Sequence, residues 1–184
     1  LFLVRYSFKI WASMKKQALK ILGEIPHELY ADVRVVSKEN EHIATKDGTV
    51  EGLESFSSMG YGIRILKDGS WGFAASNDFS KMGIEKTVKL AIKIAESSRL
   101  DKFYDVELAL QKPVKAKYKS QFKIDPFSVS LDEKIKLLLA ADKAQRVSPM
   151  IKISQTNFHA HKEKKAFVSS KGAEIEQEII WTGA

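Results

Sequence analysis

The stretch of sequence that decides the fold spans residues 61–75 and reads YGIRILKDGSWGFAA. Two runs of strand-forming residues, 61–66 and 70–75, lie on either side of the dipeptide Asp68-Gly69. An Asp-Gly pair readily adopts the positive φ angles of a tight two-residue turn. The pattern therefore predicts an antiparallel β-hairpin.

A second hairpin is predicted upstream, where Asp47-Gly48 separates residues 41–46 from residues 49–56. Strand patterns return in the last third of the chain, at residues 150–159 and 165–169, which we expect to be joined by a polar turn, and at residues 173–181. The strands should therefore pair mainly through short connections, which favours antiparallel neighbours.

Residues 30–35 show the two-residue period of a strand. Val33 and Val35 fall on one face, and Asp32 and Arg34 fall on the other. We expect the valine face to be buried and the charged face to be solvated.

Three helices are expected to pack on these strands: residues 14–22 with Ser13 as N-cap, residues 80–98, and a helix that follows a capping box of Ser130 and Glu133. Helices inserted between groups of hairpins predict an α+β fold with a mainly antiparallel sheet. Residues 1–13 form an upstream segment of doubtful relevance, and residues 14–184 form the domain. A boundary near residues 99–112 divides it into two subdomains in one interpretation and is an internal loop in the other.

Composition excludes several classes of protein. The 184 residues carry a net charge of +7 and no cysteine, so disulfides, thiolate nucleophiles and cysteine-bound metals are ruled out. No apolar run has the roughly 18 residues that a membrane helix needs. We therefore expect a cytoplasmic protein with no membrane partner.

The histidines offer only weak metal motifs. His27-Glu28 begins like a zinc-peptidase motif, but Ala31 and Asp32 stand where the second histidine would be needed. His159 and His161 would face the same side of a strand, although the nearby lysines would repel a cation. His42 stands alone in the sequence. We assign no catalytic, cofactor-binding or metal-ligating residue.

Two further segments have a functional and a structural interpretation. Gly60-Tyr61-Gly62 lacks the third glycine and the following helix of a phosphate-binding loop, so close backbone approach is favoured. Lysines dominate Lys112–Lys123, which would suit a basic nucleic-acid-binding module. Lysines also protect edge strands from aggregation, and we favour that interpretation, so nucleic acid is not the expected partner.

Four phrases, read in order, resemble the N-terminal domain of the TldD/PmbA family. They are YADVR (30–34), TKDGTVE (45–51), GYGIRILKDGSWGFA (60–74) and FVSSKGAEI (167–175). Members of this family were first described as modulators of DNA gyrase and are now regarded as zinc metallopeptidases. The resemblance extends over residues 14–181.

The resemblance implies a non-catalytic N-terminal domain of a zinc metallopeptidase that acts on peptides or unfolded segments. The family's metal-binding sequence, His-Glu-x-x-x-His, lies downstream of the part that this chain resembles, and none of the four histidines fits it. The implied zinc would belong to the full-length protein, and we expect a truncated reading frame. The implied partners are a family catalytic domain or a homologous subunit, in a homo- or heterodimer, and a peptide substrate.

Overall fold

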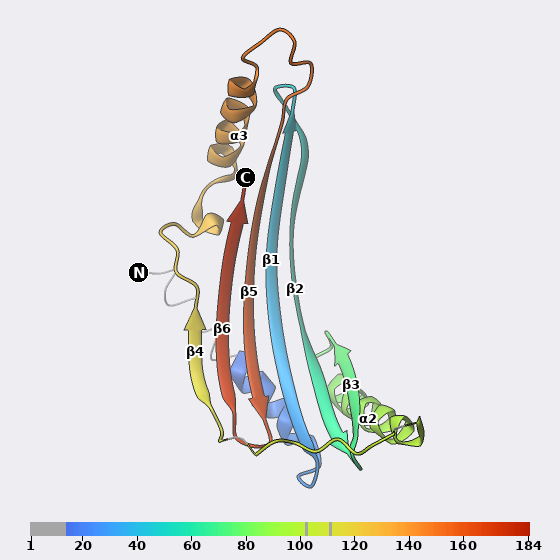
Figure 1. The fold of residues 1–184 in the computed structure, drawn as a ribbon. Helices are drawn as coiled ribbons and strands as arrows, with labels where there is room; N and C mark the ends of the chain where they lie inside the picture. Colours follow the sequence, from blue (N-terminus) through green and yellow to red (C-terminus); the bar gives the residue numbers. More distant parts are fainter. Residues whose placement is uncertain (1–13, 102, 111) are drawn as a thin grey trace. The chain divides into compact units, whose positions relative to one another are not determined.

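The computed structural model describes residues 14–101, 103–110 and 112–184 (Figure 1). The predicted N-cap Ser13 and the upstream segment 1–13 lie outside the described residues. Residues 14–23 are helical. The other helices are α2 (Lys81–Ser98), α3 (Leu131–Gln145) and two short 3-10 helices, η1 (Arg99–Asp101) and η2 (Pro126–Ser128). The strands are β1 (Tyr30–Lys46), β2 (Thr49–Lys67), β3 (Ser70–Ser76), β4 (Lys115–Lys119), β5 (Gln155–Ser169) and β6 (Glu174–Gly183).

The six strands form one sheet in the order β3-β2-β1-β5-β6-β4. The predicted α+β class with a mainly antiparallel sheet is confirmed. The exception is β4, which runs parallel to β6 (Figure 1). The Val114 carbonyl accepts from the Glu174 N–H, and the Ser120 N–H donates to the Glu178 backbone carbonyl. Residue numbers therefore rise together along this pair.

Both predicted hairpins are present. Asp47 and Gly48 have φ angles of 52° and 81°, and Asp68 and Gly69 have φ angles of 49° and 68°. These positive values in both turn residues are those of the twisted two-residue turns that Asp-Gly favours. Beyond the second turn, β2 and β3 pair in antiparallel register with Arg64 opposite Phe73.

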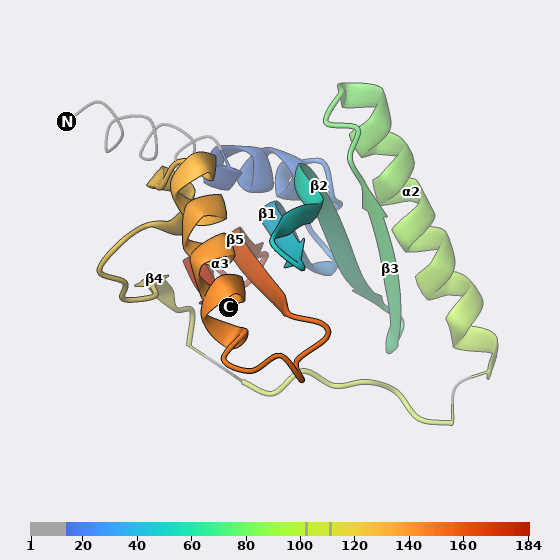
Figure 2. The same cartoon turned by 90° about the horizontal axis from the view of Figure 1, so that it is seen from above.

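The chain divides into two compact units. The described part of the first unit comprises residues 14–37, 59–101, 103–110, 112–118 and 164–177. Its core joins the helix 14–23 and α2 to one face of the strands, and Val33, Val35, Ile63 and Ile65 are all fully buried there. Figure 2 shows α2 lying along β3. The valine face predicted for residues 30–35 is thus buried.

The second unit comprises residues 38–58, 119–163 and 178–184. Here α3 lies on β1 and β5: the Thr156 hydroxyl donates to the Leu138 carbonyl over 3.2 Å, and Lys134 forms an ion pair with Glu41. The predicted capping box begins α3, since the Ser130 side chain accepts from the Glu133 N–H and Glu133 binds back to the N-cap N–H. Asp142 accepts from the Gly48 N–H over 2.6 Å and so ties α3 to the first hairpin turn.

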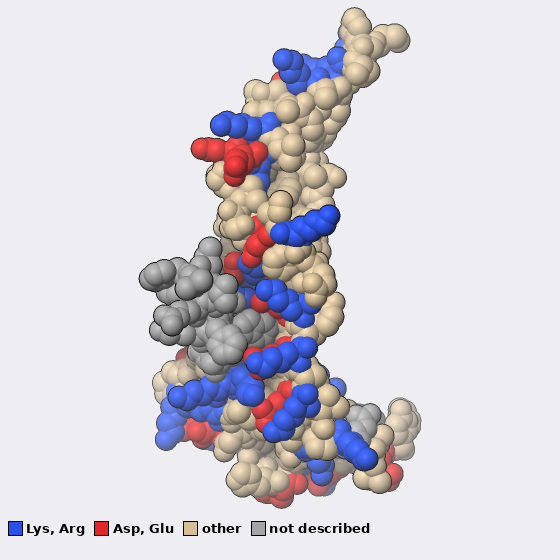
Figure 3. All heavy atoms as spheres, turned by 90° about the vertical axis from the view of Figure 1, so that its left-hand side faces the viewer, with Lys and Arg blue, Asp and Glu red and all other residues tan. Residues whose placement is uncertain are grey.

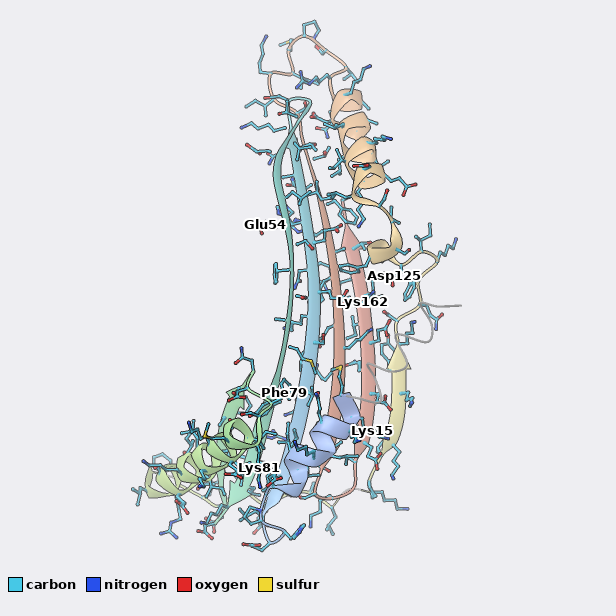
Figure 4. The ribbon with its side chains drawn as sticks, turned by 180° about the vertical axis from the view of Figure 1, so that it is seen from behind. Lys15, Glu54, Phe79, Lys81, Asp125 and Lys162 are labelled. Atoms are coloured by element: carbon cyan, nitrogen blue, oxygen red, sulfur yellow. The ribbon has the colours of Figure 1, made fainter. Side chains whose placement is uncertain are left out.

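The polar turn predicted between residues 159 and 165 is wrong, because β5 runs without a break through Gln155–Ser169. Lys162 and Lys164 lie in the span of the expected turn, yet both are buried. Lys162 binds the Asp125 carboxylate at 2.8 Å and lies 4.7 Å from the centre of the Phe127 ring (Figure 4). Ion pairing and ring contact thus let this lysine occupy a strand position under the chain that leads into α3.

The expectation that Asp32 is solvated is also wrong. Its side chain is fully buried, although it points away from the valine face of β1. Two arginines from β1 and β2 cover it. Among the described helices, none has the length and apolar character needed to cross a membrane.

Candidate functional site

Three of the four histidines gather in the second unit, which the sequence alone does not indicate. His42 of β1 and His159 of β5 stack with ring centroids 4.1 Å apart and an angle of 10° between the planes. Beside them, His161 Nδ1 lies 2.6 Å from the Asn40 Oδ1 atom, and the His161 ring stacks on Trp181 at 5.1 Å. His159 and His161 therefore share a face, as their spacing predicts, and His42 joins them.

This histidine row does not fit the zinc that the family resemblance implies. Rings stacked face to face direct their nitrogens past one another and not at a common ion, and His161 already uses Nδ1 on Asn40. In the described parts of the chain, no group of three His, Asp or Glu side chains is placed to hold a metal. His27 is exposed in the turn before β1, so it cannot form a helical pair of ligands.

The glycines of Gly60-Tyr61-Gly62 lie within β2 and not in a loop before a helix. A Cβ atom at Gly62 would lie 3.0 Å from the Phe73 ring, and one at Gly60 would lie 3.1 Å from the Ser76 carbonyl oxygen. This crowding supports the close-approach interpretation of both glycines.

The lysines of the basic segment form a ladder with acidic residues. Successive rungs join Lys115 to Glu174 at 2.8 Å, Lys117 to Glu176 at 3.1 Å and Lys119 to Glu178 at 3.4 Å. Figure 3 shows acidic and basic groups interleaved on this side of the molecule. Because β4 is the last strand of the sheet, the ladder supports the edge-strand interpretation, and it leaves little unbalanced charge for phosphates.

Glu174 is shared by two lysines, since its second oxygen lies 2.7 Å from Lys15 of the first helix. Hydrogen bonds from Lys115 and Lys15 lower the pKa of Glu174 from 4.5 to about 2. A depressed carboxyl pKa stabilises the fold above the unfolded value, and that stabilisation disappears as the pH falls from 4.5 towards 2.

We therefore expect β4 amides to lose hydrogen-exchange protection over this acid range, ahead of the amides of β1. The Glu174→Gln variant should show the weakened protection already at pH 7, because it cannot carry the charge. Equal acid sensitivity of β4 in the variant and the wild-type chain would contradict this assignment.

The other candidate surface is the outer edge of β2 in the second unit, residues 49–58. On that side β2 is followed in the sheet by β3, which pairs only with Tyr61–Lys67 (Figure 1). Among the described residues, no strand therefore covers the backbone edge of residues 49–58. Val50, Leu53 and Phe56 are 43 %, 46 % and 58 % exposed on it.

This edge lacks the lysines that the opposite edge of the sheet carries, and its charged residues are Glu51 and Glu54 alone. Residues 49–58 read TVEGLESFSS and contain no lysine, arginine or proline, whereas β4 has three lysines in five residues. Edge strands that stay unpaired usually carry such residues, because open backbone groups attract other strands. The β2 edge therefore has the character of a binding surface for an extended chain.

Two domain models of one protein family match the sequence of this chain. Residues 31–95 match the PmbA/TldA metallopeptidase domain 1, and residues 124–184 match the PmbA/TldA metallopeptidase central domain. The chain belongs to the TldD/PmbA family. The match covers both hairpins in its first part and α3, β5 and β6 in its second.

Curated relatives of this TldD/PmbA chain are longer proteins. A metalloprotease of Methanocaldococcus jannaschii is 32 % identical over 150 residues, which is 82 % of this chain and 33 % of the relative. A metalloprotease of Methanothermobacter thermautotrophicus is 31 % identical over 147 residues, which is 80 % of this chain and 31 % of the relative. The chain thus spans about a third of the length of the relatives it matches.

Solved structures share the fold of this TldD/PmbA chain. A proposed modulator of DNA gyrase from Bacteroides thetaiotaomicron superposes with a TM-score of 0.70 at 17 % identity, over 91 % of this chain and 39 % of that one. TldE from Thermococcus kodakarensis superposes with a TM-score of 0.65 at 16 % identity, over 92 % of this chain and 37 % of that one. At this identity the likeness concerns the fold alone.

Proposed function

We propose that these residues form the non-catalytic N-terminal part of a TldD/PmbA zinc metallopeptidase that works in the cytoplasm. One observation carries the proposal: the chain matches two successive domains of that family and a third of a metalloprotease, while its sequence contains no His-Glu-x-x-x-His. The metal and the reacting groups would then come from the family's catalytic domain, carried by the same protein or by a homologous subunit.

The role we propose for the chain is to hold the peptide in an extended form. The uncovered edge of residues 49–58 offers backbone N–H and C=O groups along a strand, and an extended peptide can pair with them as an additional strand. Backbone pairing is tolerant of side chains, which suits a peptidase that acts on unfolded segments. The lysine ladder of β4 gives a nucleic-acid role less support, because Glu174, Glu176 and Glu178 neutralise it.

A chimera tests the proposal. This chain would replace the matched third of the Methanocaldococcus jannaschii metalloprotease, and cleavage of casein would be measured with added zinc. We expect the isolated chain to cleave no casein and the chimera to cleave it at a rate within about tenfold of the intact relative. Zinc-dependent, chelator-sensitive cleavage by the isolated chain would contradict the non-catalytic role.

The peptide-holding edge is tested in the same chimera. Ser57→Lys places a protective charge on the uncovered edge and should raise the KM for casein several-fold with little change in kcat. Ser98→Lys, at the exposed end of α2, is the matched control and should leave both constants unchanged. An identical KM for Ser57→Lys and Ser98→Lys would remove the edge from the proposal.

A further inference from the structure

Asp32 of β1 joins two arginines on the face of the first unit that is opposite its helices. The carboxylate is fully buried, with Oδ1 2.8 Å from Arg34 Nη1, and Oδ2 2.8 Å from Arg64 Nε and 2.7 Å from Arg64 Nη2. Both arginine side chains remain more than a third exposed, at 38 % and 39 %. One negative charge therefore supports two positive charges, and the excess charge faces solvent.

Aromatic rings hold both guanidinium groups in place. Arg64 lies 4.4 Å from the centre of the Trp71 ring, and Arg34 lies 5.0 Å from the centre of the Phe167 ring. Tyr30 meets Trp71 edge to face at 5.8 Å, and burial together with the Asp32 charge raises the pKa of its hydroxyl. Stacked and ion-paired arginines lose little further side-chain entropy when they bind a ligand.

Stabilisation of the fold is a poor explanation for this arrangement. Burial of a carboxylate costs free energy, and a half-exposed ion pair returns little of it. A single arginine would balance the charge of Asp32, and the second adds repulsion at close range. Each guanidinium has five N–H donors; Asp32 accepts from Arg34 Nη1 and Arg64 Nε and lies close to Arg64 Nη2, and the Tyr30 hydroxyl also meets Arg64. The remaining donors form a rigid cationic surface bordered by aromatic rings.

We propose that Arg34 and Arg64 form a binding subsite for a carboxylate group of a peptide. A carboxylate is planar and can take two parallel N–H bonds from a guanidinium, which an ammonium group does not offer. Trp71 and Phe167 would contact the apolar atoms next to that carboxylate. The subsite rests on the peptide-handling role proposed above and adds to it a preference for peptides that present a carboxylate, on a side chain or at the C-terminus.

Fluorescence anisotropy with a labelled peptide of alternating Glu and Val and an amidated C-terminus tests the subsite. Matched probes replace every Glu by Gln, or carry a free C-terminal carboxylate on the Gln peptide, and so separate side-chain from terminal carboxylates. We expect the wild-type chain to bind at least one carboxylate-bearing probe tenfold more tightly than the amidated Gln peptide. Arg34→Gln should remove that tenfold advantage, and Arg64→Lys should reduce it because it keeps the charge and loses the fork.

Arg99→Gln is the matched control, since it removes the same charge from another half-exposed arginine of the first unit, which pairs with Asp68. It should change the affinity less than twofold. Arg34→Gln leaves Arg64 on Asp32, so the buried charge stays paired, and an unchanged near-ultraviolet circular dichroism spectrum should confirm the fold. The Arg64 Nε resonance should shift on binding in the wild-type chain, which a purely structural ion pair would not show.

Several results would overturn the subsite. Equal binding of all three peptides, equal effects of Arg34→Gln and Arg99→Gln, or an Arg64 Nε resonance that no peptide moves would each do so. A shift caused by inorganic phosphate and by no peptide would assign the arginines to phosphate instead. If the chimera fails to cleave casein while acidic peptides still depend on Arg34, the metallopeptidase role falls and the subsite stands.

Discussion

Replacing Gly72 by valine is expected to force α2 away from β3 and to lower the free energy of unfolding by about 3 kcal/mol or more. A Cβ atom at Gly72 would lie 1.9 Å from the Ala91 carbonyl oxygen and 2.6 Å from the Ala95 backbone nitrogen. Both atoms belong to the helix backbone and cannot turn aside as a side chain would. The variant must therefore separate the helix from the sheet and open part of the first core.

Urea denaturation of wild-type and variant chains measures this effect. Gly52→Val in β2 is the matched control, because a Cβ atom there meets only the Ala44 side chain, at 3.9 Å. A valine in that strand should change stability by less than about 1 kcal/mol. Equal unfolding midpoints for Gly72→Val and Gly52→Val would show that α2 does not approach β3 as described.

Lys162→Ala should lower the free energy of unfolding by about 2 kcal/mol. The substitution leaves Asp125 without its ion pair and Phe127 without the ammonium over its ring. Breaking a fully buried ion pair would lower the free energy of unfolding further. The Asp125 side chain is 31 % exposed, however, so water replaces part of the lost interaction. The chain that leads from η2 into α3 should loosen with it.

The pH dependence of this pair gives a second measure. Burial alone would raise the pKa of Asp125. Two hydrogen bonds, one from Lys162 and one from the Phe127 N–H, lower it below its ordinary value instead. The pair therefore stabilises the fold above the ordinary carboxyl pKa of 3.8 and ceases to do so as the pH falls below it. The stability difference between wild-type and Lys162→Ala chains should shrink towards acid pH.

Hydrogen exchange at α3 provides the local measurement for Lys162→Ala. Lys136→Ala, an exposed position on α3, is the matched control and should leave protection unchanged. Loss of α3 protection in the control to the same extent would show that α3 responds to the removal of any nearby lysine and not to the loss of the Lys162–Asp125 ion pair.

Local signals in the sequence predict much of the fold. Asp47-Gly48 and Asp68-Gly69 predict both hairpins because positive φ angles are a property of the turn residues themselves. Ser80 and Ser130 likewise begin α2 and α3, since an N-cap bond reaches only three residues along the chain. Interactions of this range can be inferred without knowing which strands are neighbours.

The candidate sites depend on partners that are distant in sequence and are therefore not predicted. His42 looks solitary because its stacking partner, His159, lies on another strand. Arg34 is visibly close to Asp32, but the contribution of Arg64 depends on the register of β1 against β2. Lys162 resembles a turn residue until Asp125 supplies its counter-charge. Burial of charge follows from tertiary pairing, which periodicity does not encode.

The repeated rungs between β4 and β6 make the alignment of these strands degenerate. If β4 slid by two residues, Lys117 would meet Glu174 and Lys119 would meet Glu176, and every side chain would stay on its own face. The shifted alignment keeps two of the three rungs, so charge complementarity selects the observed one only weakly. The alignment is then fixed by contacts that do not repeat along the strands. The Ser120 N–H donates to the Glu178 carbonyl, and the Ser120 hydroxyl accepts from the Ile180 N–H. A chain altered at Ser120 would be free to sample shifted pairings that keep most of their electrostatic energy.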